Sequence, residues 1–152
     1  MILNVILCTL TKIKELNQEG TEVIMAEEKN FENKVKWFLK DQGCFIIKYW
    51  GGGQFTKSGI PDILICCGGY FVAVEVKATR GTPSPVQIST LRKIRDAGGY
   101  GILLYPKDWD YFRHFIENLK CGNDFEKDLS YDHLDLTYQK WLEKYKKKGV
   151  LM

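Results

Sequence analysis

Two glycines, Gly68 and Gly69, separate two runs of mostly apolar residues, and they constrain the fold more than any other feature of the chain. A two-residue type I′ turn needs a positive φ angle at both central positions, which glycine adopts at little cost. The sequence therefore predicts a hairpin of two strands over 62–67 and 70–77. Because the facing residues next to this turn are apolar, we expect helices to bury both faces of the hairpin.

The register of this hairpin places Asp62 opposite Glu75, with their Cβ atoms about 5 Å apart. Two such carboxylates disfavour each other's ionisation, whereas Mg²⁺ is held by one or two carboxylates together with water and phosphate oxygens. Lys77 follows Glu75 by two residues and therefore points to the same face. An isolated acid at a strand end is usually a solvated edge residue. The joint pattern of Pro61-Asp62, an apolar hairpin and Glu75-Val76-Lys77 instead favours a functional cluster.

Helix signals lie on both sides of the hairpin. Asn30 is a suitable N-cap for a helix over 31–41. The segment 84–87, Ser-Pro-Val-Gln, is typical of a helix start, because its Ser can cap, its Pro can occupy the first helical position and its Gln can complete a capping box. The sequence thus predicts a helix reaching about residue 97.

The order of all the expected elements predicts an α/β fold. The remaining ones are strands over 44–50 and 100–105, a helix over 108–120 and a last helix from about 134 to the basic stretch 146–148. A strand, a helix and a strand in succession form a right-handed crossover. We therefore expect a central four-stranded mixed sheet flanked by helices, with the order α-β-β-β-α-β, plus C-terminal helices.

Three short segments follow one another in this order: Lys57-Ser58-Gly59-Ile60-Pro61-Asp62, Phe71-Val72-Ala73-Val74-Glu75-Val76-Lys77 and Ser84-Pro85-Val86-Gln87. Together they resemble the VRR-NUC nucleases of the PD-(D/E)xK superfamily, which also includes restriction endonucleases and archaeal Holliday junction resolvases. The resemblance covers roughly residues 30–106. It implies a restriction-endonuclease-like core, Mg²⁺ as cofactor with Mn²⁺ as a substitute, branched or junction-containing DNA as substrate, and a homodimer.

The resemblance also implies roles for individual residues. Asp62 and Glu75 would bind the metal, Lys77 would contact the scissile phosphate or the attacking water, and Gln87 would support the site. Glu32 is the matching candidate for a metal-associated Glu on the first helix, with Glu27 and Glu28 less well placed. Gln87 has an alternative role as the third residue of a capping box, and nothing local distinguishes Glu32 from a solvated helix residue.

Basic residues around this cluster are candidates for contacts with DNA phosphates, although each is equally a solvated surface cation. They are Lys57, Arg80, Arg92, Lys93 and Arg95. The C-terminal helix interleaves Lys140, Lys144 and Lys146–Lys148 with Trp141 and Tyr145. This helix is either an arm that binds DNA or a helix that packs its aromatic face on the domain, and we favour packing.

The composition sets broader limits. A net charge of +3 by itself indicates no nucleic-acid partner, but residues 1–28 hold five Glu and two Lys, so the basic excess belongs to the rest of the chain. The sequence contains no apolar run long enough for a membrane span and no good signal peptide, which predicts a cytoplasmic protein of phage or bacterial type. Five cysteines without CxxC spacing indicate free thiols in a reducing compartment.

The chain is expected to divide into three parts. Residues 1–24 are a doubtful extension, with Met25 as the hypothetical native start; 25–120 form the nuclease domain, and 121–152 form a basic helical tail packed on or beside it. The function that this organisation favours is a metal-dependent DNA endonuclease, structure-specific on branched DNA and acting in repair or recombination. The alternatives are a Holliday junction resolvase, a flap or end nuclease, and a non-catalytic DNA-binding or assembly module.

Overall fold

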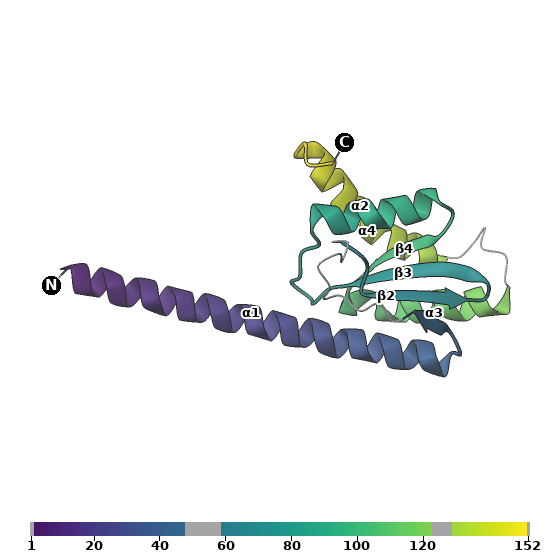
Figure 1. Cartoon of the computed structure of the whole chain (residues 1–152), viewed down its shortest axis with the longest axis horizontal. Coiled ribbons are helices and arrows are strands. Elements are labelled where there is room, and N and C mark those ends of the chain that lie inside the picture. The colour runs from purple at the N-terminus through teal and green to yellow at the C-terminus, as the bar shows by residue number, and fades with distance from the viewer. Residues whose placement is uncertain (1, 48–58, 123–128, 152) are drawn as a thin grey trace.

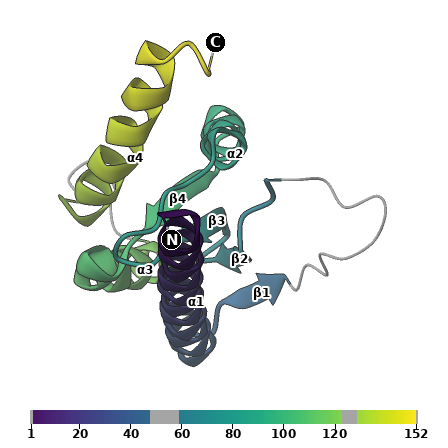
Figure 2. The same ribbon diagram turned by 90° about the vertical axis from the view of Figure 1, so that its left-hand side faces the viewer.

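The computed structural model describes residues 2–47, 59–122 and 129–151 of the 152-residue chain, with side chains from residue 10 onward. Four strands form one sheet, and helices lie on both of its faces (Figure 1, Figure 2). The elements are α1 (Ile2–Asp41), β1 (Phe45–Ile47), β2 (Ile63–Cys67), β3 (Tyr70–Val76), α2 (Pro85–Asp96), β4 (Tyr100–Leu104), the 3-10 helix η1 (Pro106–Asp108), α3 (Trp109–Cys121) and α4 (Leu129–Lys147). This mixed sheet with flanking helices confirms the expected restriction-endonuclease-like α/β architecture.

The hairpin between β2 and β3 has the expected turn and register. Gly68 and Gly69 adopt φ angles of 59° and 86°, and Ile63 pairs with Val74. Gly68 is needed for a second reason, because a Cβ atom there would lie 2.3 Å from the Leu119 carbonyl oxygen of α3. The turn is therefore held both by its own backbone angles and by the close approach of a helix.

The sheet has the strand order β1-β2-β3-β4, with antiparallel pairs up to β3 and a parallel pair between β3 and β4. Helix α2 makes the crossover between the two parallel strands. It packs so closely on β4 that a Cβ atom at Gly101 would lie 2.5 Å from the carbonyl oxygen of Leu91. This close packing brings the N-terminus of α2 to the end of β3, where Glu75 and Val76 lie.

Two apolar layers hold the helices on the sheet. On one face, α1 and α3 pack on all the long strands through residues that include Val35, Leu39, Phe112, Phe115 and Ile65. On the other face, α2 and α4 pack on β4 through Ile88, Leu91, Leu103, Tyr138 and Leu142. Figure 2 shows the sheet between these two pairs of helices. The C-terminal helix therefore uses its aromatic and aliphatic face for packing.

The expectation that helices bury both faces of the hairpin is wrong near the turn, for part of β2 and the start of β3. On the α2 side Cys66 is exposed and Phe71 is 41% exposed, whereas Val72 on the opposite face is fully buried. The reason is the position of α2, which lies over β3 and β4. A cavity of about 510 Å³ separates the edge of α2 from β2 in the part of the chain that the structure describes.

The first helix begins far earlier than its sequence signals indicate. Asn30 does not cap it: α1 runs without interruption from residue 2 to residue 41, and Asn30 is an exposed residue inside it. The stretch contains no proline and a single glycine, Gly20, so nothing in it breaks a helix. Residues before about 24 extend away from the sheet as a single rod (Figure 1).

Other boundaries agree within a few residues. The expected strand over 44–50 is β1 at 45–47; Cys44 is described but precedes the strand, and residues 48–50 lie outside the described part of the chain, as do Gly51–Gly53. The helix expected over 108–120 is α3, although Asp108 makes no capping hydrogen bond. Among the described residues, no helix is both long and apolar enough to cross a membrane.

Candidate active site

The expected acidic pair lies at the end of the hairpin distant from the turn. Asp62 directly precedes β2, and Glu75 is the last but one residue of β3. Asp62 accepts a hydrogen bond at Oδ2 from the Val76 backbone N–H, at 2.9 Å. This contact holds the Asp62 carboxylate beside β3, as the hairpin register predicts.

Glu75 is the most constrained charged residue of the cluster. It is only 1% exposed, and its Oε2 atom is buried without a hydrogen-bond partner among the described residues. Burial, together with the negative charge of Asp62, raises the pKa of Glu75 to about 7. An acidic oxygen that is buried, unsatisfied and close to a second carboxylate favours either a proton or a cation at this position.

Asp62 differs from Glu75 in its exposure. The residue as a whole is open to solvent, but the protein around its carboxyl removes enough water to raise the pKa of Asp62, against the lowering effect of the Val76 N–H and Lys77. The acidic pair thus consists of one buried carboxylate and one at the rim. A ligand arriving from solvent reaches Asp62 first.

Lys77 provides the positive charge of the cluster. Its Nζ atom donates to Glu75 Oε1 at 2.6 Å and lies 3.8 Å from Glu28 Oε1. Burial lowers the pKa of Lys77, but the hydrogen bond and the charges of Glu75 and Glu28 outweigh it and raise the pKa above its usual value. Lys77 is therefore held as an ammonium at the end of β3.

Gln87 performs both of the functions that its sequence position leaves open. Its Oε1 atom accepts from the Ser84 backbone N–H at 2.7 Å, while Ser84 Oγ accepts from the Gln87 backbone N–H at 3.2 Å, which completes a capping box. Its Nε2 atom donates to Glu75 Oε1. The amide therefore links the start of α2 to the acidic pair.

Helix α1 contributes a residue that sequence reasoning ranked lower. Glu28 contacts Lys77 and accepts a hydrogen bond from the Ala78 backbone N–H at Oε2, at 3.3 Å. Glu32, the favoured candidate, instead pairs with Lys29 at 3.0 Å and with Lys36. The signal that would have found Glu28 is its spacing of one helical turn from Glu32, which matters only once the helix continues through Asn30.

The charge of Glu32 still acts on the site. Burial raises the pKa of Glu32, but the hydrogen bonds from Lys36 and Lys29 lower it below the usual value. Its negative charge in turn contributes to the raised pKa of Asp62. Glu32 is thus near the acidic pair but is held by its own helix.

The candidate DNA contacts fall into different environments. Arg80 and Lys93 are exposed, and Arg92 lies 3.7 Å from Asp96. Arg95 is engaged inside the protein: its Nε donates to the Gly101 carbonyl at 2.7 Å, and its guanidinium pairs with Asp135 of α4. Lys57 lies outside the described residues. Arg80 is therefore the candidate nearest in sequence to the acidic pair whose side chain faces solvent.

The acidic pair is suited to bind a divalent cation, although the described part of the protein offers few ligands for it. Across residues 2–47, 59–122 and 129–151, no group of three or more His, Cys, Asp or Glu side chains lies close enough to hold a metal. The unsatisfied Glu75 Oε2 beside Asp62 nevertheless has the hard oxygen chemistry that Mg²⁺ prefers. Two carboxylates with water and phosphate oxygens are a usual set for this ion.

The sequence was also compared with known proteins. Residues 16–98 match the family described as "Archaeal holliday junction resolvase (hjc)", and this segment is more than half of the chain. No match to a curated protein was found. The matched segment contains α1 from Leu16 onward, the hairpin, and α2 with Gln87. The match confirms the restriction-endonuclease-like nuclease superfamily, and the VRR-NUC family within it stays a prediction.

Proposed function

This chain belongs to the archaeal Holliday junction resolvase family, and on that premise we propose that it is a Mg²⁺-dependent DNA endonuclease that cuts four-way junctions. The observation that carries the proposal is the buried Glu75 carboxylate, whose Oε2 atom has no described partner and lies beside Asp62. Two carboxylates held close together and shielded from water destabilise the fold. A cation that binds both carboxylates and a DNA phosphate best explains their pairing.

The chain's own residues divide the work of phosphodiester hydrolysis. Asp62 and Glu75 would hold the ion, which when bound lowers the pKa of a water and neutralises charge on the phosphate. Lys77 presents an ammonium at the same end of β3 and stabilises the negative charge that develops on the phosphate oxygens. Gln87 and Lys77 both donate to Glu75 Oε1, which leaves Oε2 as the free acceptor.

A four-way junction is resolved by two cuts on symmetry-related strands, so one active site per chain implies a homodimer on the DNA. Light scattering of the free protein and of its junction complex tests this part of the proposal. A complex with a single chain per junction would contradict it.

The decisive experiment is cleavage of a panel consisting of a four-way junction, a flap, a splayed arm and a linear duplex, with Mg²⁺, Mn²⁺ or EDTA. We expect cuts in the junction with either metal and none in EDTA. The Glu75→Gln variant should lose cleavage, whereas Glu143→Gln, a matched change at an exposed residue of α4, should cut like the wild type.

The same panel separates the alternatives. Preferred cutting of flaps or free ends would instead identify the protein as a flap or end nuclease with the same fold. Junction binding without any cleavage would identify a non-catalytic DNA-binding or assembly module.

A further inference from the structure

A pocket with cationic side chains lies beside the loop that follows Lys77. It has a volume of about 350 Å³ and is formed where residues 79–82 meet η1 and α4. The lining residues are Thr79, Arg80, Gly81, Thr82, Tyr105, Lys107, Thr137, Lys140 and Trp141. Most of them lie beyond residue 98, outside the segment that matches the resolvase family.

We propose that this pocket, with Lys107 and Lys140 as its cationic groups, binds a backbone phosphate of the DNA substrate next to the active site. The proposal rests on the proposed function and deepens it, because it assigns a substrate contact to the C-terminal helix. The phosphate would be held by charge and hydrogen bonds and would carry no base specificity.

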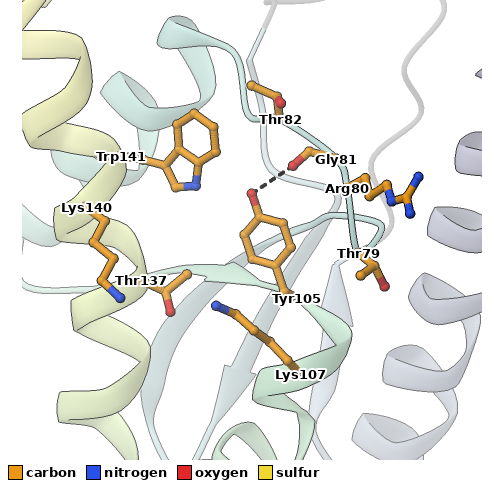
Figure 3. Close-up of a pocket in the computed structure, with 9 residues that line it drawn as sticks. All are labelled: Thr79, Arg80, Gly81, Thr82, Tyr105, Lys107, Thr137, Lys140 and Trp141. Carbon is orange, nitrogen blue, oxygen red and sulfur yellow. Dashed lines mark hydrogen bonds between the residues drawn. The ribbon is translucent and has the colours of Figure 1, made fainter.

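The donors of the pocket converge from two elements. Figure 3 shows the ammonium groups of Lys107 and Lys140 on either side of the Thr137 side chain, with the Trp141 indole above them and the Arg80 guanidinium turned away. Both lysines are exposed, and in the described part of the chain neither has an ion-pair partner; Lys107 Nζ lies 5.9 Å from the centre of the Tyr105 ring. Two uncompensated ammonium groups on one concave surface favour an anion.

Negative charge near the pocket is already engaged. Asp108 is 1% exposed; its Oδ1 atom lies 2.8 Å from His133 Nε2, and its Oδ2 atom accepts from the Thr137 hydroxyl at 3.4 Å. Glu27 accepts from the Thr79 backbone N–H at 3.1 Å, on the α1 side of the loop. Asp108 and Glu27 thus accept hydrogen bonds from groups other than Lys107 and Lys140.

The wall of the pocket is preformed. The Tyr105 hydroxyl donates to the Gly81 carbonyl oxygen at 2.9 Å, as the dashed line in Figure 3 marks, and the Tyr145 hydroxyl donates to the Pro83 carbonyl oxygen. These two bonds fasten the loop to Tyr105, which directly follows β4, and to α4. A phosphate that binds here therefore meets donors already in place, with little ordering cost.

The position along the chain identifies DNA as the source of the phosphate. Thr79 follows Lys77 by two residues, so their Cα atoms are at most about 7 Å apart. Duplex DNA carries one negative charge for about every 1.7 Å of its axis. A duplex whose scissile phosphate lies at Lys77 therefore brings neighbouring phosphates close to Thr79 and to the pocket that Thr79 lines together with Lys107 and Lys140.

The test compares charge loss inside and outside the pocket. We would measure the affinity of a four-way junction in EDTA, at several salt concentrations, for Lys107→Ala/Lys140→Ala and for the matched control Lys12→Ala/Lys14→Ala on the exposed part of α1. The pocket variant should bind about tenfold more weakly, and the slope of log Kd against log salt should fall by about one to two. The control should bind like the wild type.

Two additions make the result specific. Lys107→Arg/Lys140→Arg keeps the charge and should restore the salt slope, which a merely structural defect would not allow. Junctions with single uncharged methylphosphonates around the cut should reveal a position that matters to the wild type and no longer to the Ala variant. Two results would overturn the inference without affecting the proposed nuclease function. One is that every methylphosphonate weakens binding of the wild type and of the Ala variant equally; the other is that the Ala variant binds within twofold of the control. A wild type that neither binds nor cuts junctions would overturn the proposed function itself.

Discussion

Gln87 donates its side-chain N–H to Glu75, while the oxygen of the same amide caps the helix on which Gln87 lies. A single side chain thus satisfies the start of α2 and orients the buried acid of the candidate site. The position of α2 on the sheet is thereby linked to the orientation of Glu75.

Separating the two functions of Gln87 is the first prediction. Gln87→Glu keeps an acceptor for the Ser84 N–H but removes the donor to Glu75 and adds a third negative charge, so cleavage should fall at least tenfold. Ser84→Ala removes the other half of the capping box and should cost about 1 kcal/mol of stability with little change in cleavage. Thermal melting and junction cleavage of both variants are the measurements, and equal losses of activity would refute the distinction.

Metal addition should stabilise the wild-type protein. If Asp62 and Glu75 hold Mg²⁺ only in the folded state, the melting temperature should rise with Mg²⁺ concentration by mass action. Glu75→Gln should abolish the rise. Magnesium is compared with a potassium salt of equal ionic strength, and a rise that persists in Glu75→Gln would place the ion elsewhere.

Two substitutions of Asp62 should differ in their effect on stability in EDTA. Asp62→Asn removes the repulsion with Glu75 and keeps an oxygen for the Val76 N–H, so its free energy of unfolding should equal or exceed that of the wild type. Asp62→Ala leaves that N–H without its partner and should cost about 1–3 kcal/mol. Urea denaturation measures both, and a loss above about 2 kcal/mol for Asp62→Asn would indicate a structural role.

The acids of α1 can be ranked by experiment. Glu28→Gln weakens the contacts to Lys77 and to the Ala78 N–H, so cleavage should fall by about tenfold or more. Glu32→Gln mainly breaks pairs with Lys29 and Lys36 and should have the smaller effect on cleavage. The reverse order of the two cleavage rates would restore Glu32 as the residue of α1 that acts in the site.

The turn glycines should differ in their tolerance of a side chain. Gly68→Ala combines a positive φ with a clash against the Leu119 carbonyl and should be strongly destabilising. At Gly69 an added Cβ meets nothing within 4 Å, so Gly69→Ala should cost only the backbone penalty of about 1–2 kcal/mol. Denaturant midpoints of both variants test this, and equal losses would show that the contact with α3 contributes nothing.

The part of the site that could be predicted is the part made by local chain geometry. A two-residue turn fixes which residues face each other across a hairpin, so Asp62, Glu75 and Lys77 follow from the positions of two glycines. The capping box at Ser84 and Gln87 is likewise a contact within one turn of helix. The predicted start of α1 was wrong because a residue suited to cap a helix, such as Asn30, does not mark the helix start when the residues before it can also be helical.

The sequence by itself determined the hairpin, its register and the pairing of two acids with one lysine, because these depend on neighbours along the chain. The tertiary structure alone decided that Glu28 reaches Lys77, that Gln87 reaches Glu75, and that Lys107 and Lys140 share a pocket with the loop after Lys77. These contacts join residues from separate elements, and their positions depend on how each helix buries its apolar face on the sheet.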